Sequence, residues 1–167
     1  MANYRGHAIG GGLAGGLTLA GFYAVTLGDM PNGGALIEDW QLVVGVFVLS
    51  VLFGLWPDVD TNSKAQDLFF GIAFISDLLL IANKQYVAAA FLGLIAMTPI
   101  VGTHRGWTHK KLTAILVPLP IMIIPYLATK HVGDMAILLY IASVMGYYSH
   151  LLLDGLIIKR FRIKGGW

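Results

Sequence analysis

The chain has 167 residues, of which 57% are hydrophobic and only 12% are charged, and its formal net charge is +2. Because a soluble domain carries about 25% charged residues, this composition excludes an ordinary water-soluble surface and predicts an integral membrane protein. The sequence contains no cysteine. Disulfides and thiolate metal sites are therefore excluded, which leaves histidine, carboxylates and backbone oxygen as metal ligands.

Turn residues and prolines divide the chain into six apolar segments, which we expect to be helices. The first is rich in glycine, and its small-xxx-small pairs predict close helix packing, including a homo-oligomer through this helix. We expect it to be retained, because it shows no cleavage site. The second stops at Pro57. The six segments cover residues 8–27, 40–56, 64–82, 87–101, 109–129 and 135–158.

These segments predict an all-α, polytopic membrane helix bundle of about six transmembrane or partly re-entrant helices, forming a single domain over residues 1–167. The third and fourth segments are the shortest or most polar, and we expect them to be tilted, short or re-entrant. The fifth contains Pro118, Pro120 and Pro125, which should kink it. Thr108 is the expected N-cap of this helix.

Basic residues set the expected orientation. Six crossings return the chain to its starting side, so the N- and C-termini share one side of the membrane. Of the 11 Lys and Arg residues, all but Lys84 and Lys130 fall on that side, and the positive-inside rule makes it cytoplasmic. The basic tail at 159–164 suits anionic lipid, and we expect no nucleic acid partner.

The same side gathers most of the polar chemistry of the chain. Four of the five histidines lie there, together with three aspartates. His150 and Asp154 are four residues apart on one helix face, within an apolar run that holds no other charged residue, and intramembrane ionisable groups mark functional sites. The predicted metal ligands are His7, Asp58, Asp60, His104, His109, His150 and Asp154.

Seven ligands exceed the four that one zinc ion needs. Two arrangements remain open: one metal ion with additional outer-shell groups, or two metal ions about 3.5–4 Å apart. Mixed histidine and aspartate ligation suits divalent transition metals better than calcium or magnesium. We expect zinc first, with manganese and iron as the alternatives.

The combined motifs resemble the YdjM-like family of membrane-bound metal-dependent hydrolases over most of the chain. The motifs that carry this resemblance are His7, Pro-Asp-Val-Asp at 57–60, His-Arg-Gly-Trp-Thr-His at 104–109 and Ser-His-Leu-Leu-Leu-Asp at 149–154. The resemblance implies a metal-dependent, phospholipase-like hydrolase in a bacterial or phage-encoded inner membrane. Lys110 stands where the family usually carries serine, a departure that leaves the ligands intact but bears on substrate contacts.

A metal-bound water has a lowered pKa, and a site at headgroup depth predicts a phosphoester of a lipid or lipid-linked substrate. Arg105 is expected to hold phosphate oxygens, and Asp60 or Asp154 to act as general base or acid. Two alternatives remain open. One is a non-catalytic, metal-stabilised membrane protein. The other is an ion or metal transporter, which requires polar residues along a path through the bilayer.

Overall fold

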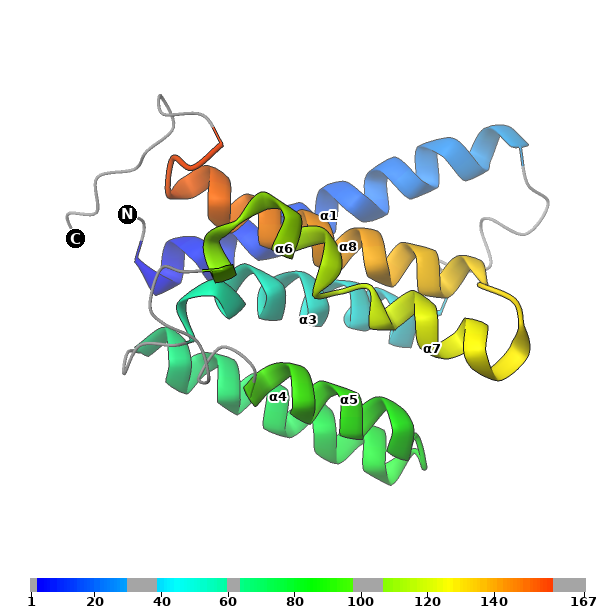
Figure 1. The fold of residues 1–167 in the computed structure, drawn as a ribbon. Helices are drawn as coiled ribbons and strands as arrows, with labels where there is room; N and C mark the ends of the chain where they lie inside the picture. The colour runs from blue at the N-terminus through cyan, green and yellow to red at the C-terminus, as the bar shows by residue number, and fades with distance from the viewer. Residues whose placement is uncertain (1–2, 30–38, 60–63, 98–106, 158–167) are drawn as a thin grey trace.

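The structure is a computed structural model that describes residues 3–29, 39–59, 64–97 and 107–157. Within these ranges it contains helices and turns and no strand. Three long helices, α1 (Tyr4–Asp29), α3 (Trp40–Leu55) and α8 (Asp134–Leu153), lie side by side (Figure 1). The spans Tyr4–Val25, Trp40–Asp58 and Asp134–Leu153 are long and apolar enough to cross a membrane. The predicted all-α membrane bundle is confirmed.

Local chemistry fixes where the first two long helices begin and where α3 ends. The side chain of Asn3 accepts a hydrogen bond from the Gly6 amide at 2.9 Å, and Asp39 accepts from the Gln41 amide at 3.0 Å. Such side chains satisfy amides that have no partner within the helix. Pro57 lacks an amide donor, so α3 gives way to the short 3-10 helix η1 (Trp56–Asp58).

The three long helices approach backbone to backbone. A methyl carbon on Gly146 of α8 would lie 2.2 Å from the Ser50 carbonyl oxygen of α3, and one on Gly11 of α1 would lie 2.6 Å from that same oxygen. The Ser50 hydroxyl also donates to the Ala142 carbonyl at 3.0 Å. Gly11 of α1 thus serves close packing within the chain. Gly12 instead faces open space, and the homo-oligomer through α1 stays a prediction.

The hairpin formed by α4 (Lys64–Ala82) and α5 (Tyr86–Met97) makes a separate layer next to α3 (Figure 1). The 12 residues of α5 span about 18 Å at 1.5 Å per residue, well short of the ~30 Å hydrocarbon core. This agrees with the expectation of a short fourth segment, whereas the 19 residues of α4 span about 28 Å. The Trp56 indole donates to the Ile95 carbonyl at 2.9 Å and so ties the hairpin to α3.

The fifth predicted segment is broken rather than kinked. Pro118 and Pro120 each remove an amide donor, and together they interrupt the helix that the sequence predicts over 109–129. Thr108 is not its N-cap, because Lys110 occupies that position without a capping side chain. The segment instead forms a 3-10 turn and two helices: η3 (Trp107–His109), α6 (Lys111–Leu116) and α7 (Pro120–Thr129).

The larger hydrophobic core lies at the end of the bundle where α3 passes into η1. Trp56, Val59, Phe69, Tyr147 and Leu151 are all at most 2% exposed there. These residues come from η1 and the turn after it, the hairpin and α8. The core therefore holds together the elements that carry the polar cluster described next.

Candidate metal centre

Four chain segments bring polar side chains to one end of the bundle. Asp58, His109, His150 and Asp154 each offer a ligand atom, all within 4.8 Å of one another, and together they could hold a metal ion. His7 joins them from the first turns of α1. The five come from α1, the last residue of η1, the last residue of η3, the last turn of α8 and its C-cap.

The ligand atoms are evenly spaced. His7 Nε2 lies 3.5 Å from Asp154 Oδ1 and 3.7 Å from Asp58 Oδ2. Asp58 Oδ1 lies 3.5 Å from His109 Nε2 and 3.7 Å from His150 Nε2, and the latter lies 3.7 Å from Asp154 Oδ2. Typical hydrogen bonds are shorter, about 2.7–3.2 Å. Ligand atoms of a tetrahedral zinc shell with bonds of about 2.0–2.1 Å stand roughly 3.3–3.4 Å apart, which is close to this spacing.

Several of these atoms are buried without a hydrogen bond. Both ring nitrogens of His7, the Nε2 atoms of His109 and His150, and both carboxylate oxygens of Asp154 are in this state. A buried polar group left unpaired costs about 1–3 kcal/mol. A single cation would offset that cost for each atom that it contacts, so the donor set fits a divalent transition metal.

Hydrogen bonds on the far side of two imidazoles set their orientation. The Nδ1 atom of His150 lies 2.9 Å from the Gly54 carbonyl oxygen. Because a carbonyl only accepts, Nδ1 carries the proton and the lone pair of Nε2 faces the cluster. The Nδ1 atom of His109 lies 3.1 Å from the Thr108 hydroxyl, which likewise leaves its Nε2 toward the cluster.

The turn that carries His109 is held by residues that the sequence interpretation missed. The Tyr147 hydroxyl donates to the Thr108 carbonyl, and the Thr113 hydroxyl donates to the Trp107 carbonyl at 2.6 Å. Tyr147 is fully buried. One signal could have found it: Tyr147 precedes His150 by three residues, and positions three apart share a helix face.

The cluster is deeply buried except at one aspartate. The side chains of His7, His150 and Asp154 are at most 1% exposed, and that of His109 is 8% exposed, whereas Asp58 is 25% exposed. Burial alone would raise the pKa of the Asp154 carboxyl, but the imidazoles of His7 and His150 hold that pKa below its ordinary value. Asp154 is thus an anionic oxygen donor at neutral pH.

The structure describes only part of the predicted site. Asp60, His104 and Arg105 lie outside the described residues. The sequence places His131 on the other side of the membrane from the predicted site. In the structure His131 is exposed and lies in the short segment between α7 and α8. The cluster of five therefore contains every predicted ligand that the structure describes, and the choice between one and two metal ions stays open.

Comparison with known proteins identifies the family. A family model described as YdjM inner membrane protein matches residues 1–159. No curated protein and no solved structure matches the chain. The match covers all five clustered residues and confirms the resemblance drawn from the motifs.

Proposed function

The chain belongs to the YdjM inner membrane protein family, and from this premise we propose that it is a membrane-embedded, metal-dependent hydrolase of a lipid or lipid-linked phosphoester. One observation carries the proposal. Buried nitrogen and oxygen atoms without hydrogen bonds converge at one end of membrane-length helices. Such a cluster suits metal-assisted hydrolysis at the depth of lipid headgroups.

Asp58, His109, His150 and Asp154 would hold the metal ion. His7 would be a fifth ligand or would orient the Asp154 carboxylate, which lies 3.5 Å from its Nε2 atom. We expect zinc first, and manganese or iron as alternatives. A divalent metal ion supplies Lewis acidity and lowers the pKa of a coordinated water toward 7. The predicted ligands His104 and Asp60 would extend this set toward a second metal ion.

The chain's own residues would bind and orient the substrate. Asp58 is the most exposed of the cluster, so the substrate would approach on its side. Lys110 and Lys111 are exposed just after His109 and would attract an anionic headgroup. Arg105 would hold phosphate oxygens through paired N–H groups. Asp154 or Asp60 would accept the proton of the attacking water.

A non-catalytic, metal-stabilised protein is the second candidate, and burial favours it. Three of the four grouped ligands have side chains at most 8% exposed, and four ligands already complete a tetrahedral structural site. Such a site would bind metal without an open position for substrate. The two candidates therefore agree on metal content and differ in turnover.

The test measures metal content and turnover together. Purified wild-type protein should contain about one or two transition-metal ions per chain and should cleave a member of a panel of phospholipids and lipid-linked phosphates supplied with zinc or manganese. His150→Ala should lose both properties. His131→Ala is the matched control, because its imidazole is exposed outside the cluster, and it should keep both.

Two outcomes would count against the proposal. Full metal content in His150→Ala would refute the metal site itself. Bound metal with no turnover across the panel would refute the hydrolase and favour the metal-stabilised protein.

A further inference from the structure

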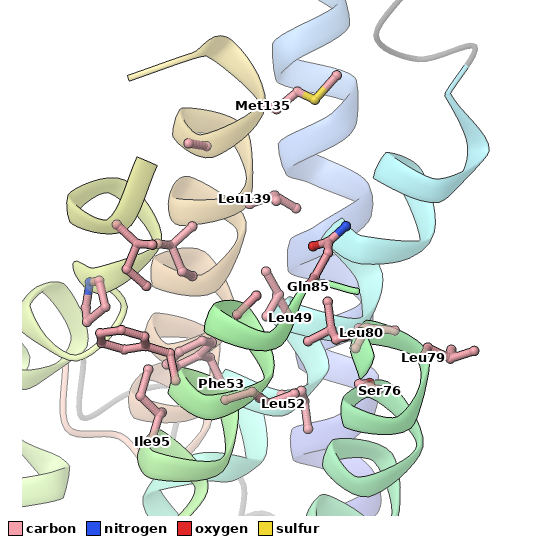
Figure 2. Close-up of a pocket in the computed structure, with 18 of the residues that line it drawn as sticks. Leu49, Leu52, Phe53, Ser76, Leu79, Leu80, Gln85, Ile95, Met135 and Leu139 are labelled. Carbon is pink, nitrogen blue, oxygen red and sulfur yellow. The ribbon is translucent and has the colours of Figure 1, made fainter. Parts of the chain in front are cut away.

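A cavity of about 520 Å³ lies between α3, the α4–α5 hairpin, α7 and α8. This volume falls within the roughly 300–1,000 Å³ of small-molecule sites. Figure 2 shows Leu52 and Phe53 of α3 among its lining side chains, with Ile95 of α5 and Leu139 of α8 around the same space. The cavity is separate from the metal centre, because none of the five clustered residues lines it.

The cavity is elongated along α3. Its lining positions on this helix and the following turn begin at Val44 and end at Trp56. At a rise of 1.5 Å per residue, that stretch covers about 18 Å. The axis of the cavity therefore follows a membrane-length helix, and a long, narrow occupant fits it better than a compact one.

The side chains that line the cavity favour a hydrocarbon ligand. Aliphatic and aromatic side chains make up most of the lining, and the described part of the chain contributes no lysine, arginine, aspartate or glutamate to it. Two of the few polar lining residues, Asn83 and Gln85, lie at the hairpin turn, away from the metal centre. A polar or charged ligand buried along this wall would lose its hydration without replacement hydrogen bonds.

One end of the cavity adjoins the metal centre. Trp56 lines the cavity and is fully buried, and Asp58 of the metal centre follows two residues later. The indole stays in place through its hydrogen bond to the Ile95 carbonyl. A hydrocarbon chain that fills the cavity would therefore have one end at Trp56, close to the metal centre.

We propose that this cavity binds one hydrocarbon chain of a membrane lipid, which lies along α3. Two of the helices that line the cavity, α3 and α8, are long and apolar enough to cross a membrane, and lipid chains are the most abundant apolar molecules in the bilayer interior. Identifying this lipid with the hydrolysed substrate, whose headgroup would then lie toward Trp56, rests on the proposed function. The chain site itself stands on the cavity's shape, lining and position.

Native mass spectrometry of the full-length protein, reconstituted with dioleoylphosphatidylglycerol and transferred to detergent, tests the chain site. Ala88 of α5 lines the cavity, whereas Ala90 is exposed on the same helix and does not. Wild type and the control Ala90→Trp should each retain one lipid, and Ala88→Trp should retain none. No retained lipid in the wild type, or equal retention in both variants, would overturn the proposal. A dimer that dissociates only in Ala88→Trp would assign the cavity to a second copy of the chain instead.

Metal content shows whether the variants fold. Should Ala88→Trp lose its metal as well, Ser76→Phe fills the cavity from α4 with a smaller intrusion, and the same comparison applies. Turnover separates the two proposals. Without any turnover in the wild type, the proposed function fails while lipid retention still decides the chain site.

With turnover present, Ala88→Trp should reduce cleavage of the dioleoyl lipid more than cleavage of a dibutyryl analogue, because remote binding energy is lost only for the long chain. An equal reduction for both lipids would refute the assignment of the chain to the substrate.

Discussion

The packing of α1, α3 and α8 differs sharply from that of the α4–α5 hairpin. Gly11 and Gly146 let the three long helices meet at backbone distance, where even one methyl carbon would collide with Ser50. In the hairpin, Gly71 and Gly93 have no atom within 4 Å of an added methyl carbon. A cavity, rather than close packing, separates the hairpin from much of α3.

This difference matches what each region is proposed to bind. Metal ligands must keep their geometry to within a fraction of an ångström, and the tightly packed helices hold His7 and His150 with stacked rings 3.9 Å apart. A hydrocarbon chain is bound by non-directional contacts and tolerates a looser wall. The closely packed helices α1, α3 and α8 therefore suit metal binding, and the more loosely packed hairpin side suits a lipid chain.

The largest expected contrast is in metal binding. Asp58→Ala should abolish it, because Asp58 contacts three imidazoles of the cluster. The loss should exceed the ~10–100-fold that an outer-shell substitution costs. Asp77→Ala, the same change in α4 of the hairpin, should leave metal content unchanged. Elemental analysis of both purified variants measures the contrast, and comparable metal loss in both would contradict it.

Glycine substitutions probe packing directly. Gly146→Ala should lower the free energy of unfolding by about 1–3 kcal/mol, as overpacking does, because the new carbon would lie 2.2 Å from a backbone oxygen. Gly93→Ala in α5 should instead raise it by about 0.4–1 kcal/mol by restricting the unfolded chain. Thermal unfolding in detergent compares the two, and equal stability of the variants would show that the regions pack alike.

Removing one hydroxyl should weaken the metal centre from outside. Tyr147→Phe deletes the hydrogen bond to the Thr108 carbonyl, at a cost of about 0.5–1.5 kcal/mol, and should lower metal affinity about tenfold by loosening His109. Tyr140→Phe is the control, since its exposed hydroxyl donates to the Ile115 carbonyl of α6. Competition with a chelator gives both affinities, and unchanged affinity in Tyr147→Phe would remove its positioning role.

The smallest effect on the folding of the single chain is expected at Gly12, on the side of α1 that faces open space. Gly12→Leu should leave folding intact, because nothing lies within 4 Å of an added methyl carbon. It should convert the predicted homo-oligomer to monomer by blocking close approach of a second α1. Light scattering in detergent measures the mass, and an oligomer of unchanged mass would exclude this face as the contact.

The sequence by itself determined the class of fold, the family and the clustered residues. An apolar chain has few choices in lipid, where backbone groups must pair within helices, so hydropathy and Pro57 located the long spans. The same spans placed His7, Asp58, His109, His150 and Asp154 near one end. Charges and histidines in such a chain are too costly to be incidental, which made them visible as a pattern.

Only the tertiary structure decided how those residues meet. The break between α6 and α7, the role of Thr108 and the support from Tyr147 depend on contacts between distant segments, which local propensity does not encode. The cavity along α3 is likewise a property of packing. Hydropathy indicates which residues avoid water, but an apolar side chain has the same hydropathy whether it contacts another helix, a bilayer or a bound lipid chain.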